Sequence, residues 1–433
     1  MNKEILRLAI PNIVSNITIP LLNLLDLALM GNWGSEHHIG AISIGGMIFN
    51  FLFWAFAFLR MGTSGFTAQA FGEKNQEEQA HLFFRSVITG FLSGIILILL
   101  QWPIGKIAFG LINGSQTVET LASGYFRIRI WSSPATIALF AFTGWFIGMQ
   151  NSSIPMLVAL IINITNISLN LLFIFKLGMK TEGIALGATI AQYVGLILSI
   201  GFVYFKYQWV RRYFQLKDIL NLAKLKGFFL VNIDIFIRTS CIIAVFTLFT
   251  SKSAGINDTT LAANSLLLQF LLFFSFFIDG FAYAGEALTG RYIGEKNKKM
   301  VIKLIKKLFT WGAVLALMFS IVYILFAERI IMLLSASQNV LTQAKPYLGW
   351  VIALPIISFI SYIWDGIYVG ATASKGMRNA LLISTLGLFL PVYLFLFPIL
   401  GNHAIWLSLT LFMIGRGLFQ SLMAKRQIGE KLR

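Results

Sequence analysis

Polar side chains within apolar stretches are the residues of this chain whose types and spacing could do chemistry. Asn12, Asn16, Asn23 and Asp26 lie in one largely apolar stretch near the N-terminus. In an α-helix they fall within an arc of about 80°, so they share one face. A carboxylate on a buried face can take up and release a proton, because burial disfavours its charged form. The stretch therefore predicts a proton-binding or cation-binding face centred on Asp26.

A second polar stripe occurs in the segment "NITNISLN". Asn163, Asn166 and Asn170 fall within an arc of about 60° on one helix face. Amides alone could equally well be interhelical hydrogen-bond partners. The carboxylate of Asp26 favours a pocket shared by the two stripes.

The elements that carry these stripes must be membrane helices. Only 12% of the residues are charged and 57% are hydrophobic, whereas ordinary globular proteins have about 25% charged residues. We expect an all-α membrane protein whose first helix is retained rather than cleaved as a signal peptide. About twelve transmembrane helices are expected, centred near residues 20, 50, 95, 135, 165, 195, 240, 275, 315, 357, 390 and 413.

The net charge of +17 is distributed unevenly along these spans. Of the 34 Lys and Arg residues, 23 lie at the termini or in loops after even-numbered spans, six lie in the opposite loops, and five lie in or near spans. By the positive-inside rule both termini are cytoplasmic, in the inner (plasma) membrane of the cell. The basic surplus thus reflects topology and attraction to anionic lipid, and no nucleic-acid partner is expected.

The chain contains an internal repeat. "TAQAFGEKN" begins at Thr67 and "TGRYIGEKN" begins at Thr289. The separation between these two threonines, called the repeat offset below, also pairs Tyr125 with Tyr347, and it pairs two G-x-x-x-G motifs that predict close helix packing. We therefore expect two parallel-repeat six-helix bundles, residues 1–205 and 228–433, joined by a cytoplasmic amphipathic linker at 206–227.

The polar pocket is absent from the second half. Without a gap, the repeat offset places Leu248, Leu388 and Val392 at the positions of Asp26, Asn166 and Asn170. The two halves therefore share a scaffold and differ in chemistry.

The second half has charged residues of its own, which could be cation sites or structural charges. Asp234 and Arg238, spaced i,i+4, predict a structural ion pair. Arg60 could neutralise an acid of the eighth span across the two halves. The remaining acids in these spans are Asp279, Glu286 and Asp365.

Two prolines flank the polar face of the first helix. Pro11 and Pro20 each remove a backbone hydrogen bond and favour a bend. A static kink and a moving one are equally compatible with the sequence.

Long segments of the chain resemble one family. "IPNIVSNITIPLLNLLDLALMGNWG", "FLRMGTSGFTAQAFGEKN", "NITNISLNLLFIFKLGMKTEGIALGATIAQY" and "FFIDGFAYAGEALTGRYIGEKN" together resemble multidrug and toxic compound extrusion (MATE) transporters of the DNA-damage-inducible F branch. The resemblance implies two six-helix bundles around a central cleft and alternating access by rocking. It also implies export of amphipathic, often cationic compounds in exchange for protons or sodium.

The resemblance extends to individual residues. The family's first-helix carboxylate falls on Asp26 and its fifth-helix asparagine on Asn166. Asn170 stands where many members have aspartate, which removes a second acid from the pocket. Asp365 resembles an acid of the tenth helix that other branches use for cation coupling.

Two other functions remain open from the sequence. A flippase for a lipid-linked precursor would have the same architecture, although its cleft would be rich in basic residues. An intramembrane enzyme is less favoured, because the four histidines show neither metal-ligand spacing nor a Ser-His arrangement in the spans. The chain has no G-x-x-x-x-G-K-[ST] nucleotide loop. We expect no metal or other cofactor apart from the coupling ion, H⁺ or Na⁺, and we expect a monomer.

Overall fold

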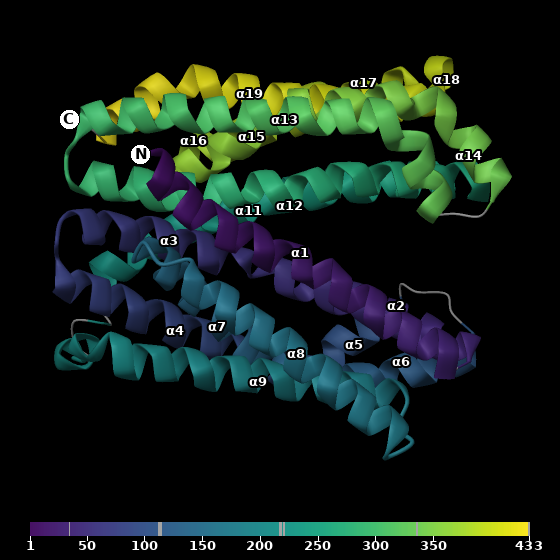
Figure 1. The fold of residues 1–433 in the computed structure, drawn as a ribbon, viewed down its shortest axis with the longest axis horizontal. Coiled ribbons are helices and arrows are strands. Elements are labelled where there is room, and N and C mark those ends of the chain that lie inside the picture. Colours follow the sequence, from purple (N-terminus) through teal and green to yellow (C-terminus); the bar gives the residue numbers. More distant parts are fainter. Residues whose placement is uncertain (34, 111–114, 216–218, 220, 335–336, 432–433) are drawn as a thin grey trace. The chain divides into compact units, whose positions relative to one another are not determined.

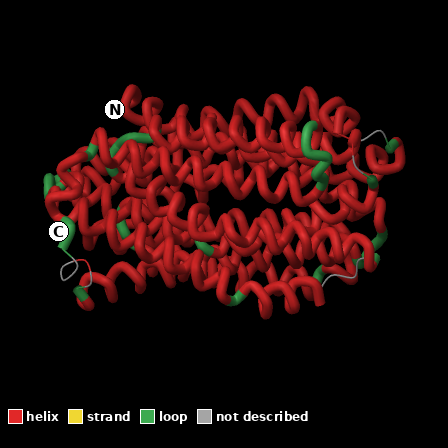
Figure 2. Tube along the Cα trace, turned by 90° about the horizontal axis from the view of Figure 1, so that it is seen from below, coloured by secondary structure: helices red, strands yellow, loops and turns green. Residues whose placement is uncertain are grey.

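The computed structural model describes all residues except 34, 111–114, 216–218, 220, 335–336 and 432–433. Among the described residues the regular elements are all helical (Figure 2), and twelve helical segments are long and apolar enough to cross a membrane. Each expected span centre falls within one of these segments. The predicted all-α membrane architecture is thereby confirmed.

The chain divides into two compact units. The first unit comprises Val14–Phe228, and the second comprises Met1–Ile13 together with Phe229–Arg433. The expected linker at 206–227 falls within the first unit, and the first turns of α1 (Asn2–Trp33) belong to the second unit.

The first unit holds the rest of α1 and the helices that follow it in the chain (Figure 1). These are α2 (Glu36–Ala55), α3 (Ala57–Gly72), α4 (Gln76–Leu99), α5 (Gln101–Gly110), α6 (Gln116–Arg129), η1 (Ile130–Ser132), α7 (Ser133–Gly148), α8 (Ser153–Phe175), α9 (Thr181–Lys206) and η2 (Gln208–Tyr213).

The second unit contains both long helices and short helical segments (Figure 1). Its elements are α11 (Leu222–Ala254, from Phe229 onward), α12 (Asp258–Gly294), α13 (Lys298–Leu334), α14 (Gln338–Ala344), η3 (Lys345–Tyr347), α15 (Leu348–Gly370), α16 (Ser374–Ile383), η4 (Ser384–Phe389), α17 (Leu390–Phe395), α18 (Phe397–Leu400) and α19 (Asn402–Lys431).

The repeated nonapeptide forms the same helix–turn–helix in both units. Lys74 and Lys296, which the repeat offset pairs, both have left-handed backbones, with φ of 57° and 53°. Each is followed by an asparagine, Asn75 or Asn297, whose side-chain oxygen accepts a hydrogen bond from the backbone N–H three residues later. An asparagine in this position caps the following helix. The phrase is therefore repeated because it encodes the turn between α3 and α4 and the turn between α12 and α13.

The two G-x-x-x-G motifs also make equivalent contacts. A methyl group at Gly144 would come within 2.3 Å of the carbonyl oxygen of Arg60, and one at Gly366 within 2.1 Å of the carbonyl oxygen of Ala282. Arg60 and Ala282 are themselves paired by the repeat offset. The predicted close packing is confirmed, and it joins α7 to α3 in the first unit and α15 to α12 in the second.

A π-helical segment breaks the repeat in the second unit. η4 is a π-helix, and a π-bulge accommodates one extra residue in a helix. The residues one position after Leu388 and Val392, which the repeat offset pairs with Asn166 and Asn170, are Phe389 at the end of η4 and Tyr393 in α17. These two rings are buried and stacked, with centroids 5.5 Å apart. The second unit thus has a buried aromatic pair beside the positions that the repeat offset pairs with the two asparagines.

The first part of the expected linker packs against α4. Val210 in η2 is fully buried, and the ring of Phe214 contacts that of Phe84 with centroids 4.9 Å apart. The Nε of Arg85 donates to the carbonyl oxygen of Ile219 at 2.9 Å. Residues 216–218 and 220 lie outside the described part, and contact of the linker with lipid headgroups stays a prediction.

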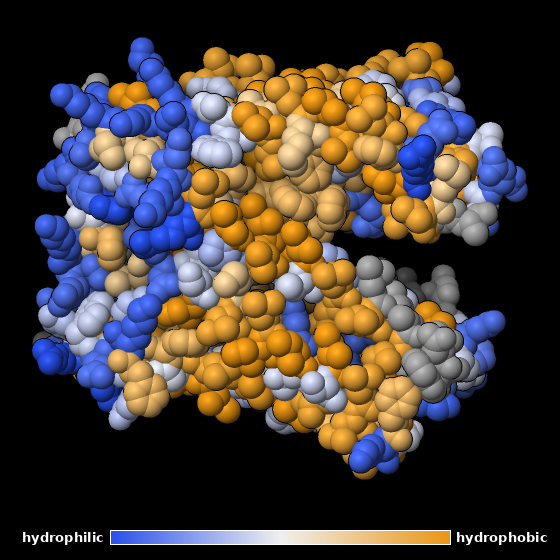
Figure 3. Space-filling view, in the orientation of Figure 1, coloured by the Kyte–Doolittle hydropathy of each residue, from blue (hydrophilic) through white to orange (hydrophobic). Residues whose placement is uncertain are grey.

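Hydrophilic residues gather at one end of each unit, taken by itself. In the first unit this is the end with the α3–α4 turn, and in the second unit it is the end with the α12–α13 turn; in each unit hydrophobic residues cover the middle of the helices (Figure 3). The pattern is the one expected for helices that cross a hydrocarbon layer.

Candidate functional site

Asp26 and two asparagines of α8 meet in the first unit. The Nδ2 of Asn170 donates to Asp26 Oδ1 at 2.7 Å and to Asn166 Oδ1 at 2.8 Å. Asn166 and Asn170 are buried, at 3% and 0% exposure, and Asp26 is partly buried. A single amide group therefore joins α1 to α8 through a carboxylate.

Arg129 supplies positive charge to this site without a direct ion pair. Its charge acts on Asp26 electrostatically, yet within the described residues no salt bridge to Asp26 forms. The Nε and Nη1 of Arg129 are buried and have no hydrogen-bond partner among the described residues. Arg129 is the last residue of α6, and its place in the site was not predicted from the sequence. An arginine near the middle of a predicted apolar segment was the available signal.

Gly187 of α9 fixes the position of the Asn170 amide. A methyl group at Gly187 would lie 2.2 Å from Asn170 Oδ1. The oxygen therefore packs against the α9 backbone, and it has no hydrogen-bond partner among the described residues. This packing leaves the Nδ2 group of Asn170 directed to Asp26 and Asn166.

The other asparagines of the two predicted stripes are Asn12, Asn16, Asn23 and Asn163. The Nδ2 of Asn12 donates to the carbonyl oxygen of Leu8 at 2.8 Å, and this residue belongs to the second unit. Asn163 is partly buried, and its Nδ2 has no partner among the described residues. Asn16 is partly buried on α1, and the side chain of Asn23 lies outside the described part of the structure. A role for these two asparagines stays a prediction.

A second network of buried charges lies in the second unit around Asp365. Its carboxylate accepts hydrogen bonds from Arg238, from Arg416 at 2.8 Å and from the Nε2 of Gln420 at 2.6 Å. Arg416 and Gln420 are 1% and 0% exposed. Two guanidinium groups thus donate hydrogen bonds to the carboxylate that the resemblance associates with cation coupling.

The predicted ion pair between Asp234 and Arg238 is wrong. Asp234 instead binds Arg378 at 2.5 Å and accepts a hydrogen bond from Ser374 Oγ at 2.7 Å, while Arg238 binds Asp365. The i,i+4 spacing allowed the pair, but partners on α16 and α15 are better placed for both side chains.

The two predicted acids of the eighth span, Glu286 and Asp279, lie on α12 in the second unit. Glu286 is 1% exposed, and its backbone carbonyl lies against Gly370. Asp279 is partly buried and acts electrostatically on Tyr362. The expected neutralisation of one of these acids by Arg60 stays a prediction.

The helix α1 runs without interruption from Asn2 to Trp33. Pro11 and Pro20 both lie inside it, so neither ends the helix. Their role in bending stays a prediction. Among the described residues, no group of three or more His, Cys, Asp and Glu side chains could hold a metal ion.

Comparison with known proteins identifies the family. The MatE family model matches residues 11–172 and 235–395. The chain belongs to the MATE family. It is 34% identical over 424 residues to DNA damage-inducible protein F of Escherichia coli, covering 96% of this chain and 90% of that protein. It is 25% identical to the probable multidrug resistance protein NorM of Thermotoga maritima, covering 80% of this chain and 75% of that one.

The fold matches a solved MATE-like structure. A transporter of the MOP superfamily from Pyrococcus furiosus superimposes with a TM-score of 0.89 at 17% identity, covering 100% of this chain and 96% of that one. That structure was described as having a binding pocket of reverse polarity. At this identity the likeness shows the fold alone.

Proposed function

We propose that this MATE protein is a secondary active exporter of amphipathic, often cationic compounds, driven by protons that enter through Asp26. The observation that carries the proposal is the Asp26 carboxylate, held by one amide hydrogen bond and without a direct ion pair among the described residues. A carboxylate held in this way can change its charge without breaking a salt bridge.

The charge state of Asp26 acts on the link between α1 and α8. The ionised carboxylate is a strong acceptor for the Asn170 amide, and hydrogen bonds to charged groups contribute about 1.5 to 3 kcal/mol. A protonated carboxyl group is a weaker acceptor and offers an O–H donor in addition. Protonation therefore weakens this link and biases the protein between its two access states by that difference alone.

The charges around the buried acids of both units favour the proton over sodium as the coupling ion. The arginines around Asp365 act as fixed counter-ions, and removing them from a buried carboxylate would be costly. A single carboxylate in the first-unit network supplies one negative charge, which one proton neutralises. Asn170, at the position of a family aspartate, further lowers the negative charge there.

The substrate class rests on the relatives. The Thermotoga protein carries the name of a probable multidrug resistance protein. Proton and cationic substrate would compete for the negative charge of Asp26, and such competition is what an antiporter requires. The apolar body of the substrate would be accommodated by the aromatic side chains, which make up 14% of the chain.

The test is ethidium efflux from proteoliposomes that contain the purified chain. A gradient of one pH unit supplies about 1.4 kcal/mol per proton, and we expect it to drive uphill efflux in the wild type but not in Asp26→Asn. Asp258→Asn is the matched control, because Asp258 is exposed in the first turn of α12.

Two outcomes would contradict the proposal. Undiminished gradient-driven efflux in Asp26→Asn would remove Asp26 from the mechanism. Efflux that is driven by a sodium gradient and unaffected by a pH gradient would show that sodium, rather than the proton, is the coupling ion.

A further inference from the structure

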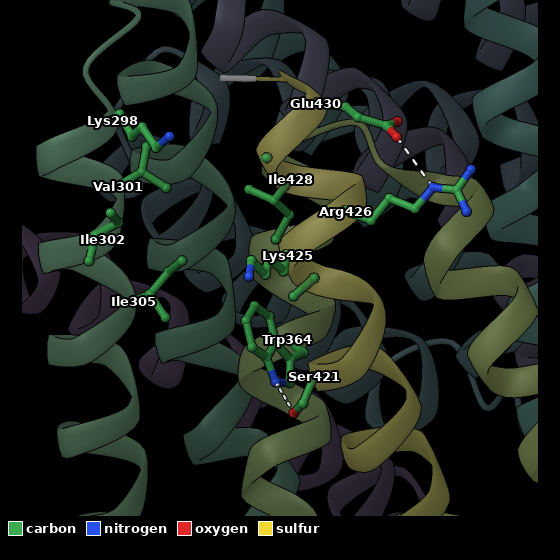
Figure 4. Close-up of a pocket in the computed structure, with 12 residues that line it drawn as sticks. Lys298, Val301, Ile302, Ile305, Trp364, Ser421, Lys425, Arg426, Ile428 and Glu430 are labelled. Atoms are coloured by element: carbon green, nitrogen blue, oxygen red, sulfur yellow. Dashed lines mark hydrogen bonds and ion pairs between the residues drawn. The ribbon is translucent and has the colours of Figure 1, made fainter. Parts of the chain in front are cut away.

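A groove of about 610 Å³ lies within the second unit, between α13 and α19 (Figure 4). Trp364 of α15 lies at its lower end. The volume falls within the range of roughly 300 to 1,000 Å³ that is typical of small-molecule sites. The residues that line the groove are distinct from those of the Asp26 network and the Asp365 network.

The mouth of the groove is positively charged. Lys298 is the first residue of α13, and Lys425 lies near the end of α19, on the side that faces α13 in Figure 4. Arg426 and Glu430 also line the site, but they point away from α13 and bind each other at 3.4 Å. Lys298 lies at the mouth, whereas Lys425 lies lower, below Ile428 and above Trp364 (Figure 4), so the two lysines leave a net positive charge along the groove.

Apart from Lys425, the walls beneath Lys298 are largely apolar. Val301 and Ile305 follow Lys298 on α13 and extend toward α19, which carries Ile428 on the facing side (Figure 4). The two turns of helix from Lys298 to Ile305 correspond to a depth of about 10 Å. The indole N–H of Trp364 donates to Ser421 Oγ at 2.7 Å, so the nitrogen of this side chain already has a hydrogen-bond partner.

We propose that this groove binds an anionic phospholipid. The headgroup phosphate would lie between Lys298 and Lys425, beside Val301 and Ile428, and the upper part of an acyl chain would continue along Ile305 toward Trp364. Basic pockets between transmembrane helices bind anionic headgroups in this manner. A soluble phosphate compound would satisfy the lysines but would leave the apolar walls uncovered. The exposed Leu418 and Leu422 on α19 continue the apolar surface beside the groove.

The test measures lipid bound to the purified full chain by native mass spectrometry. The protein is titrated with phosphatidylglycerol or with phosphatidylcholine of the same acyl chains. One Lys near a membrane surface contributes about a fivefold change in binding. We therefore expect Lys298→Gln/Lys425→Gln to bind phosphatidylglycerol about 25-fold more weakly, with phosphatidylcholine binding unchanged.

The matched control is Lys303→Gln/Lys431→Gln. These lysines are exposed on the same two helices and do not line the groove, so the control should bind phosphatidylglycerol like the wild type. An equal loss in both double variants would show a general charge effect and would overturn the site. Competition by glycerol 3-phosphate, which has no acyl chain, would show a soluble-anion site and would overturn the lipid as occupant.

Discussion

Asp26 and Asp365 show how one residue type takes two different roles. Asp26 accepts from an amide, whereas Asp365 accepts from two guanidinium groups and an amide. A carboxylate between two fixed cations is held ionised, and its main effect is on stability. The surroundings of each residue, rather than its place in an apolar span, therefore decide which acid can exchange a proton.

Replacing Asn170 by Leu should lower pH-driven ethidium efflux about tenfold or more. The substitution removes the donor that distinguishes the two charge states of Asp26. Asn163→Leu on the same helix is the contrast, because the Asn163 amide has no partner among the described residues, and its efflux should stay within about twofold of wild type. An equal loss of efflux in the two variants would show that the whole asparagine stripe of this helix, rather than Asn170 alone, is needed for transport. The factor of ten corresponds to about 1.4 kcal/mol, the lower end of the range for such hydrogen bonds.

Asp365→Asn should destabilise the protein by about 3 to 5 kcal/mol, because it leaves Arg238 and Arg416 without their buried counter-ion. Asp234→Asn should cost less, since its partner Arg378 is 29% exposed. Thermal unfolding in detergent measures both. Wild-type stability of Asp365→Asn combined with lost gradient coupling would instead make Asp365 a coupling residue.

Glycines determine how closely neighbouring elements pack. Gly144 and Gly366 bring pairs of helices into backbone contact, and Gly187 brings α9 against Asn170. The sequence predicted the first kind of contact from G-x-x-x-G spacing. It did not predict the second, because the G-x-x-x-G spacing of Gly183 and Gly187 does not show that Gly187 contacts the side chain of Asn170 rather than a helix backbone.

The substitution Gly187→Ala should impair transport by displacing the Asn170 amide from Asp26. Gly201→Ala, on the same helix, places its methyl group in open space. It should leave efflux unchanged and stabilise the helix by about 0.5 to 1 kcal/mol. Efflux assays and unfolding curves for the two variants separate coupling from stability. Normal efflux in Gly187→Ala would show that the amide position is not critical.

At the scale of the whole molecule, the sequence predicted the internal repeat but did not predict the π-helical segment that interrupts it in the second unit. The repeat offset reproduces the left-handed lysines and the glycine contacts, because local turns and close packing constrain sequence strongly. The π-helix at Ser384–Phe389 has no comparable signature, and it contains Leu388, the residue that the repeat offset pairs with Asn166. Asp234 was assigned the wrong partner for a similar reason: spacing within one helix says nothing about competing partners on another.

Both termini should be cytoplasmic, as the distribution of Lys and Arg predicts. In a Cys241→Ser background, which removes the only cysteine, Ser35→Cys should react with a membrane-impermeant thiol reagent added to intact cells. Lys431→Cys should react only after the cells are opened. Both positions are exposed. Labelling of Lys431→Cys from outside intact cells would show that the topology is the opposite of the predicted one.

The paired glycine contacts have a consequence for hydrogen–deuterium exchange. Where two helices touch backbone to backbone, neither water nor lipid can enter, and amide protons exchange only when the pair separates. The amides around residues 60–64 and 282–286, which face Gly144, Gly148, Gly366 and Gly370, should be among the last to take up deuterium. Because the contacts are copied in the two units, both segments should exchange slowly, and a methyl at any one of these glycines should accelerate exchange in its own unit alone.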